Sequence, residues 1–214
     1  MLTSGYVAGR WLRERLPAGA RVLVVGEQGL LRELQEAGLT ATRAGEATAD
    51  LTTPAAVVVG MDRCFSYRTL AAAQAAIRGG ALFVATNRDA TFPTPDGLGP
   101  GAGAIVAAVA IAAGREPVLV GKPALALAET LAALTGIPAA QTLFIGDRLS
   151  TDIAMGRAAG MITALVLTGV TSEDDLHRAR SANETGEPEA APALPDHVLR
   201  DLRELPALLD SLGA

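Results

Sequence analysis

The feature of this sequence that most limits its fold is a repeated alternation of short apolar runs with longer runs rich in Ala and Leu. The short runs, built largely from Val, Ile, Leu, Phe and Ala, lie at residues 22–25, 56–59, 82–85, 118–120, 142–145 and 163–167. Most of the longer runs end at a glycine, as helices commonly do. The alternation predicts an α/β protein with a largely parallel sheet, because a helix must return the chain to the edge where the next parallel strand begins.

The longer runs predict helices at residues 28–37, 67–78, 102–113, 124–135, 152–159, 172–179 and 203–212. Residues 86–101 are rich in Pro, Gly and Asp and are expected to form a long loop. Residues 181–195 are polar and rich in Pro and Glu, which predicts a solvated linker. Residues 198–199 are expected to form a last short strand.

Composition excludes several classes of function. A net charge of -5 with no long basic run disfavours a nucleic-acid partner, since phosphate neutralisation needs clustered Lys and Arg. The longest apolar run, residues 102–113, is too short to cross a membrane. The single cysteine, Cys64, cannot form an internal disulfide, and no signal peptide is recognisable, so a cytoplasmic location is expected.

The strongest chemical signal is the string from Phe144 to Ile153, which reads FIGDRLSTDI. An apolar strand delivers Asp147 to its carboxyl end, where ligands bind in open α/β sheets. Asp152 is expected in the first turn of the next helix, with Ser150 or Thr151 as its N-cap. The two carboxylates suit a hard cation such as Mg²⁺. The alternative is that Asp147 is a plain loop residue and Asp152 only complements the helix dipole.

A second signal is Lys122, which follows Val120 and Gly121 at the end of a predicted strand and precedes Pro123. Its ammonium group can bind a phosphoryl group. Taken alone, a Gly-Lys-Pro triplet is more often a surface turn. The phosphoryl-binding interpretation is strengthened because only one predicted helix and one predicted strand separate Lys122 from Asp147.

Together these strings resemble the third and fourth motifs of haloacid dehalogenase phosphatases. The resemblance is closest to subfamily IIA, which includes nitrophenyl-phosphatases, phosphoglycolate and pyridoxal phosphatases and NagD-like nucleotidases. It extends over nearly the whole chain. Further similar strings lie at residues 3–6, 60–63, 65–67, 85–89, 94–97, 101–103 and 167–170.

The resemblance implies a Mg²⁺-dependent phosphatase that acts on small phosphomonoesters through an aspartyl-phosphate intermediate. It implies a Rossmann-like parallel-sheet core and a large α/β cap of the C2 type. The corresponding domains are a linker and helix at residues 1–16, a cap at 17–117 and the C-terminal part of the core at 118–214. A small phosphorylated metabolite is the expected partner, with a possible homodimer through the cap.

The resemblance also implies roles for single residues. Lys122 would be catalytic, Asn87 and Asp89 would contact the substrate from a cap loop, and Asp147 and Asp152 would bind the metal. The family's nucleophile motif, Asp-x-Asp, occurs nowhere in the sequence. Asp62, at the end of an apolar strand, is the only candidate for a substitute nucleophile. The resemblance places it in the cap instead. We therefore expect a complete cap joined to part of a core.

Two other functions compete with the phosphatase. A degenerate, inactive paralogue would bind a phosphorylated metabolite or a protein partner without turnover. A dinucleotide-binding domain is suggested by Gly26 and Gly29, but the third glycine of that fingerprint is absent at the required spacing. The simpler interpretation of that segment is a strand followed by the start of a helix.

Overall fold

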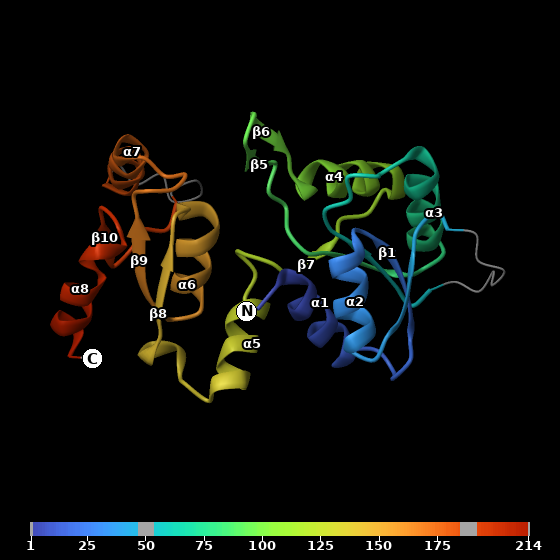
Figure 1. The fold of residues 1–214 in the computed structure, drawn as a ribbon, viewed down its shortest axis with the longest axis horizontal. Helices are drawn as coiled ribbons and strands as arrows, with labels where there is room; N and C mark the ends of the chain where they lie inside the picture. The colour runs from blue at the N-terminus through green and yellow to red at the C-terminus, as the bar shows by residue number, and fades with distance from the viewer. Residues whose placement is uncertain (1, 47–53, 185–191, 214) are drawn as a thin grey trace. The chain divides into compact units, whose positions relative to one another are not determined.

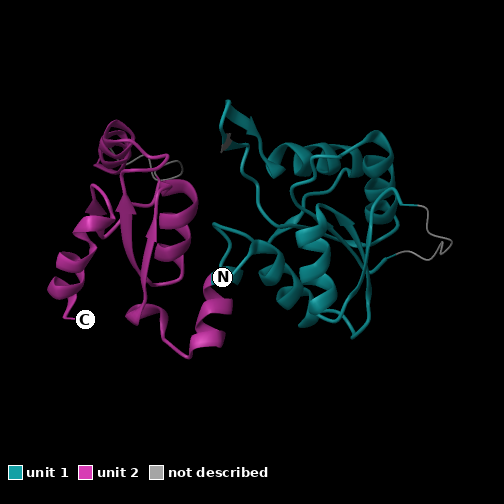
Figure 2. Cartoon of the chain, viewed as in Figure 1, with its two compact units in different colours: residues 1–127 teal, residues 128–214 magenta. Residues whose placement is uncertain are grey.

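The computed structural model describes residues 2–46, 54–184 and 192–213. The chain divides into two compact units, residues 1–127 and 128–214. Figure 1 labels most of the elements, and Figure 2 colours the two units. Each unit has its own parallel sheet, which confirms the predicted α/β class.

The first unit is built on a five-stranded sheet in the order β2-β1-β3-β4-β7, and every neighbouring pair is parallel. The central strand β3 is buried along its whole length, as expected for a parallel strand covered on both faces. The bounds of the strands are Arg21–Val25 for β1, Thr40–Arg43 for β2, Ala56–Val59 for β3, Leu82–Ala85 for β4 and Val118–Leu119 for β7.

Helices cover both faces of this sheet. Helices α1 and α2 share one apolar cluster with the side chains of Val22, Val24 and Val58. Helices α3 and α4 share a second cluster with Val25, Val57 and Val59, which point to the opposite face. The four helices span Ser4–Arg13, Gln28–Glu36, Tyr67–Arg78 and Ala102–Ala113.

Two elements of the first unit differ from the prediction. The predicted loop at residues 86–101 contains an antiparallel hairpin of β5, Thr91–Thr94, and β6, Gly97–Pro100. The prolines and glycines in this hairpin concealed it, because such residues usually mark loops. Strand β2 was not predicted, since its sequence TATR has no apolar run and it lies at the edge of the sheet.

The second unit carries a three-stranded parallel sheet in the order β10-β9-β8. Leu149, Ile153 and Leu165 pack with α7 in one apolar cluster, whereas Ala164 and Leu199 pack with α8 in another. The strands are β8, Leu143–Gly146, β9, Ile162–Val166, and β10, His197–Leu199. The helices are α5, Ala126–Thr135, α6, Ala154–Ala158, α7, Glu173–Glu184, and α8, Leu205–Leu212. Short 3-10 turns lie at Ala139–Gln141 and Leu202–Glu204, and a π-helix lies at Leu149–Ile153.

One detail of the second half of the chain also differs from the prediction. Helix α7 runs to Glu184, so the predicted linker at 181–195 begins inside a helix. Residues 185–191 of the predicted linker lie outside the described residues. The predicted strand at residues 118–120 is present as β7, which pairs with β4 within the first compact unit.

The division into a cap at 17–117 and a core at 118–214 stays a prediction. Of the helices that the structure describes, none is long and apolar enough to cross a membrane.

Candidate functional site

Asp147 and Asp152 frame the turn that leaves β8. Asp152 is buried, and its Oδ2 accepts hydrogen bonds from the backbone N–H groups of Asp147, at 3.2 Å, and Arg148, at 3.1 Å. The predicted N-cap at Ser150 or Thr151 is wrong, because neither the π-helix nor α6 has a side-chain cap. Asp152 instead accepts the backbone N–H groups of the two residues that precede the π-helix.

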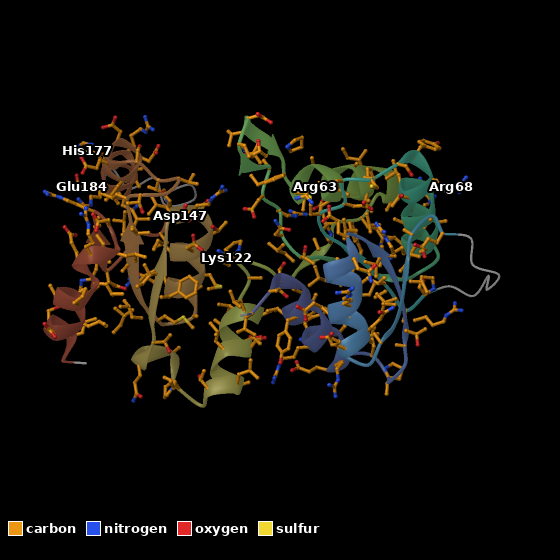
Figure 3. All side chains as sticks on the ribbon, in the orientation of Figure 1. Arg63, Arg68, Lys122, Asp147, His177 and Glu184 are labelled. Carbon is orange, nitrogen blue, oxygen red and sulfur yellow. The ribbon has the colours of Figure 1, made fainter. Side chains whose placement is uncertain are left out.

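Asp147 is held from the other side by the loop after β9. Its Oδ2 accepts the N–H of Val170 at 2.9 Å, and its backbone carbonyl accepts the N–H of Thr171 at 3.0 Å. Figure 3 labels Asp147 in the second unit. The loops after β8 and β9 therefore form one hydrogen-bonded ledge at the carboxyl end of the sheet.

Two glycines make this close packing possible. A Cβ atom on Gly146 would lie 2.2 Å from the Cβ of Asp152, and one on Gly169 would lie 2.2 Å from Oδ2 of Asp147. Both distances are far inside van der Waals contact, so neither position has room for a side chain. Glycine is therefore required at both positions, because the carboxylates of Asp152 and Asp147 occupy the space that a side chain would need.

The donor chemistry of this ledge fits Mg²⁺, which prefers carboxylate oxygens and usually retains several water ligands. In each carboxylate, one oxygen already accepts hydrogen bonds from backbone N–H groups. Over residues 2–46, 54–184 and 192–213, no group of three or more His, Cys, Asp or Glu side chains is placed to hold a metal. Asp147 and Asp152 would therefore supply one or two ligands of a largely hydrated ion.

Lys122 lies in the first unit, just after β7, and its side chain is exposed (Figure 3). A Cβ on the preceding Gly121 would lie 1.9 Å from the carbonyl oxygen of Thr86. Glycine thus lets the β7 end pack directly on the end of β4. Lys122 is the only lysine of the chain, whose other 17 basic residues are all arginine. A compact ammonium group is therefore present at this one position.

Asn87 and Asp89 follow β4 and are linked to each other. The Asn87 Nδ2 donates to Asp89 Oδ2 at 2.9 Å, and the Thr86 hydroxyl donates to Asn87 Oδ1 at 3.1 Å. The backbone carbonyl of Asp89 also accepts the N–H of Gly103 at the start of α4. This loop is consequently held in place from β4 to α4.

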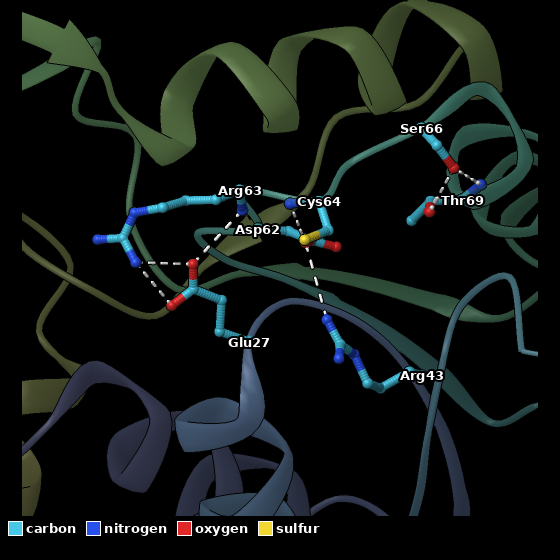
Figure 4. Close-up of polar contacts among 7 residues, drawn as sticks. All are labelled: Glu27, Arg43, Asp62, Arg63, Cys64, Ser66 and Thr69. Carbon is cyan, nitrogen blue, oxygen red and sulfur yellow. Dashed lines mark hydrogen bonds and ion pairs between the residues drawn. The ribbon is translucent and has the colours of Figure 1, made fainter.

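The structure thus groups the predicted residues in two sets, each within one unit. Asn87 and Asp89 lie on the loop that packs against the turn before Lys122, whereas Asp147 and Asp152 form the ledge of the second unit. Asp62 is buried and belongs to neither set. Its Oδ1 accepts the N–H of Cys64 at 2.9 Å and lies 3.8 Å from an Arg43 nitrogen (Figure 4).

Sequence patterns did not single out a further set of polar residues in the first unit. Glu27 accepts two hydrogen bonds from the Arg63 guanidinium, at 2.9 and 3.0 Å (Figure 4). The Thr3 hydroxyl donates to Glu33 at 2.8 Å. These partners are about thirty residues apart, and no short motif joins them, so only the fold reveals the pairs.

Comparison with known proteins places the chain in a family. A model of the family described as haloacid dehalogenase-like hydrolase matches residues 5–160, and one described as HAD-hydrolase-like matches residues 119–205. D-glycerol 3-phosphate phosphatase of Mycobacterium tuberculosis is 42% identical over 209 residues, which cover 98% of this chain and 55% of that protein. The chain thus spans little more than half the length of this relative.

Solved structures agree with this assignment. Glycerol phosphate phosphatase from Mycobacterium tuberculosis, in complex with magnesium, matches with a TM-score of 0.81 and 41% identity, covering 95% of this chain and 57% of that chain. The p-nitrophenyl phosphatase from Archaeoglobus fulgidus matches with a TM-score of 0.81 and 33% identity, covering 97% and 74%.

Each unit is a parallel α/β fold, and the second unit carries two carboxylates at the carboxyl end of β8. The chain belongs to the haloacid dehalogenase-like hydrolase family, and within it to a group resembling subfamily IIA. The predicted family membership is confirmed.

Proposed function

We propose that the protein containing this chain is a Mg²⁺-dependent phosphatase that hydrolyses small phosphomonoesters. The observation that carries the proposal is the ledge of Asp147 and Asp152 at the carboxyl end of β8. The names of the relatives, which act on glycerol phosphate and p-nitrophenyl phosphate, support the reaction class. A relative solved with magnesium supports the choice of metal.

Each residue has a role in this proposal. Asp147 and Asp152 would hold the Mg²⁺, which when bound neutralises charge on the phosphoryl oxygens. Lys122 places an ammonium group on a phosphoryl oxygen and stabilises the charge that develops there. Asn87 and Asp89, fixed by their mutual hydrogen bond, present polar groups to the substrate. The rigidity of that loop favours orientation of the substrate.

The proposed reaction also needs a carboxylate that attacks phosphorus. No Asp-x-Asp pair occurs among them, and buried Asp62 is bound to the turn after β3. The proposal assigns the attacking carboxylate to sequence outside these residues. That carboxylate would form a bond to phosphorus as the ester P–O bond breaks, and the alcohol would leave with a proton. Water would then release phosphate from the aspartyl-phosphate.

The two parts of the chain have different roles in the proposal. The first would act as a C2-type cap, with residues 17–117 as its body, and residues 118–214 would form the C-terminal part of the core. A homodimer through the cap belongs to the same proposal. A small phosphorylated metabolite is the expected partner.

The test is release of inorganic phosphate from glycerol 3-phosphate and p-nitrophenyl phosphate by the full-length protein that contains this chain. The proposal predicts turnover with Mg²⁺ and loss of turnover when EDTA removes it. If phosphate release is absent with Mg²⁺ across both esters, the phosphatase proposal is wrong.

The missing Asp-x-Asp pair favours one second candidate, a non-catalytic protein that binds a phosphorylated metabolite or a partner protein. It predicts saturable binding of glycerol 3-phosphate by the full-length protein without release of phosphate. The same assay, run beside a binding titration, separates the two candidates.

A further inference from the structure

A pocket of about 490 Å³ lies within the second unit, between the π-helix and helix α7. Its walls come from residues 148–150, from residues 170–171 after β9, and from residues 175, 178, 179 and 182, which share one face of α7. A volume of this size suits a small organic ligand. The proposed phosphatase reaction uses none of the side chains that line this pocket.

The positive charge of the pocket comes from two guanidinium groups, those of Arg148 and Arg178. Within the described part of the chain, Arg178 forms one hydrogen bond, to Oδ1 of Asp175 one turn earlier in α7. A guanidinium has five N–H donors in a planar fork that matches the geometry of a carboxylate. Arg178 therefore keeps donors for a ligand in the pocket.

Asp175 contributes a fixed negative charge to the same wall. Its Oδ2 accepts the hydroxyl of Ser172 at 2.6 Å and the backbone N–H of Ser172 at 3.0 Å. These hydrogen bonds, together with Arg178, lower the pKa of Asp175 to about 2, so it is ionised at neutral pH. The two guanidinium groups and this carboxylate leave one net positive charge, which a monoanion neutralises, whereas a dianion would also be repelled by Asp175.

Thr171 offers the pocket a hydroxyl that no described protein group uses. Thr171 lines the pocket and is only 7% exposed, and its backbone N–H donates to the carbonyl of Asp147 at 3.0 Å. Its hydroxyl has no hydrogen-bond partner in residues 2–46, 54–184 and 192–213. Every fully buried side-chain N or O atom of these residues does have a partner, so the Thr171 oxygen is accessible. It is available to a ligand that enters the pocket.

The remaining side chains of the pocket are mainly hydrocarbon. They belong to Leu149, Val170, Ala179, Ala182 and Pro192. Val170 is 56% exposed, so a hydrocarbon chain that packs on it would remove apolar surface from water. A ligand here meets cationic and hydroxyl groups at one part of the pocket and apolar side chains at another.

We propose that this pocket binds a small organic carboxylate, a monoanion with a short hydrocarbon chain. Arg178 and Arg148 supply the charge that attracts the carboxylate, and the Thr171 hydroxyl supplies a further donor. The hydrocarbon chain packs on Val170 and its apolar neighbours. The site goes beyond the proposed phosphatase function and does not depend on it, because all of its lining residues belong to the second unit.

The experiment titrates the full-length protein that contains this chain with hexanoate in an isothermal calorimeter. We expect saturable binding with a dissociation constant on the order of 0.1–1 mM, given the few heavy atoms of the ligand. The neutral analogue 1-hexanol should bind at least about tenfold more weakly, because it lacks the charge. Inorganic phosphate at mildly alkaline pH is mostly a dianion and should not displace hexanoate.

Matched variants test the residues that carry the proposal. Arg178→Gln should weaken hexanoate binding at least about tenfold. Thr171→Val keeps the shape of the side chain and should weaken binding about threefold without lowering the midpoint of urea unfolding, because its hydroxyl bonds to no described protein group. Arg180→Gln removes the same charge from an exposed position of α7 that does not line the pocket, and should bind hexanoate like the parent protein.

Each outcome decides for or against the inference. Absence of saturable binding contradicts it, and so does an Arg178→Gln variant that binds like the parent or no more weakly than Arg180→Gln. Equal binding of 1-hexanol, or displacement of hexanoate by inorganic phosphate, contradicts the assigned ligand class. The titration needs no turnover, so the inference can fail while the full-length protein still releases phosphate.

Discussion

The buried carboxylate of Asp152 accepts the N–H groups of both Asp147 and Arg148, so the turn after β8 depends on a side chain inside the following helix. The sequence predicted a metal-binding role for Asp152 but not its hydrogen bonds to the preceding turn. The usual rule looks for Ser or Thr just before a helix, and Ser150 and Thr151 satisfied it. The π-helix changes which side chain reaches the turn, and the sequence gives no signal for it.

Replacement of Asp152 should therefore affect stability as well as the proposed metal binding. Asp152→Asn keeps the size of the side chain but loses the charge that strengthens its two backbone hydrogen bonds. We expect the free energy of unfolding to fall by about 1–3 kcal/mol. Urea unfolding followed by far-UV circular dichroism measures it.

The control for this prediction is Asp174→Asn, which changes an exposed carboxylate in the first turn of α7. It should cost less than about 1 kcal/mol. Equal effects of the two substitutions would show that the hydrogen bonds from the turn to Asp152 add no special stability.

Lys122 permits a second test at this scale, because every other basic residue of the chain is arginine. Lys122→Arg preserves the charge but replaces a compact ammonium with a planar guanidinium. We expect phosphate release by the full-length protein to fall at least about tenfold while the circular dichroism spectrum stays unchanged. Wild-type turnover in this variant would argue against a specific contact between Lys122 and the phosphoryl group.

Among the elements, β9 and β10 are joined by a polar contact. The Asp196 Oδ2 accepts both the N–H and the hydroxyl of Thr163, each at 2.8 Å, and Asp196 also pairs with Arg157. Burial alone would raise the pKa of Asp196, but the hydrogen bonds from Thr163 and the charge of Arg157 outweigh it and lower the pKa below 3.8. The contact therefore favours the ionised carboxylate.

This lowered pKa predicts how stability depends on pH. Because the folded pKa lies below the unfolded one, Asp196 stabilises the fold above the unfolded value, and the contribution disappears as pH falls through the folded pKa. Asp196→Asn should cost about 1 kcal/mol at pH 6, and the difference from wild type should shrink below about pH 4.

Urea unfolding at a series of pH values measures this difference. Asp210→Asn, an exposed position on α8, serves as control and should cost less than about 0.5 kcal/mol. A difference between wild type and Asp196→Asn that stays constant down to pH 3 would contradict the prediction.

The regular elements were largely predictable, and the exceptions have physical reasons. Apolar runs such as 56–59 and 82–85 became buried strands because a parallel sheet covered on both faces needs continuous hydrophobicity. Strand β2 has the sequence TATR and owes its pairing to β1, a tertiary effect that local pattern does not contain. The β5–β6 hairpin forms despite Pro93 and Pro100.

For the whole molecule, several glycines and carboxylates of the motif strings have a packing role in the fold. Gly146 and Gly169 leave room for Asp152 and Asp147, and Gly121 leaves room for Thr86. The pairs Glu27–Arg63 and Thr3–Glu33 were not predictable, since their partners meet only after the sheet and helices are in place.

The central claim is that Asp147 holds the magnesium of a phosphatase. The direct measurement is the Mg²⁺ dependence of phosphate release from p-nitrophenyl phosphate by the full-length protein and its Asp147→Asn variant. We predict that the variant needs at least about tenfold more Mg²⁺ for half-maximal release, or loses release altogether. An unchanged Mg²⁺ requirement in Asp147→Asn would contradict the account.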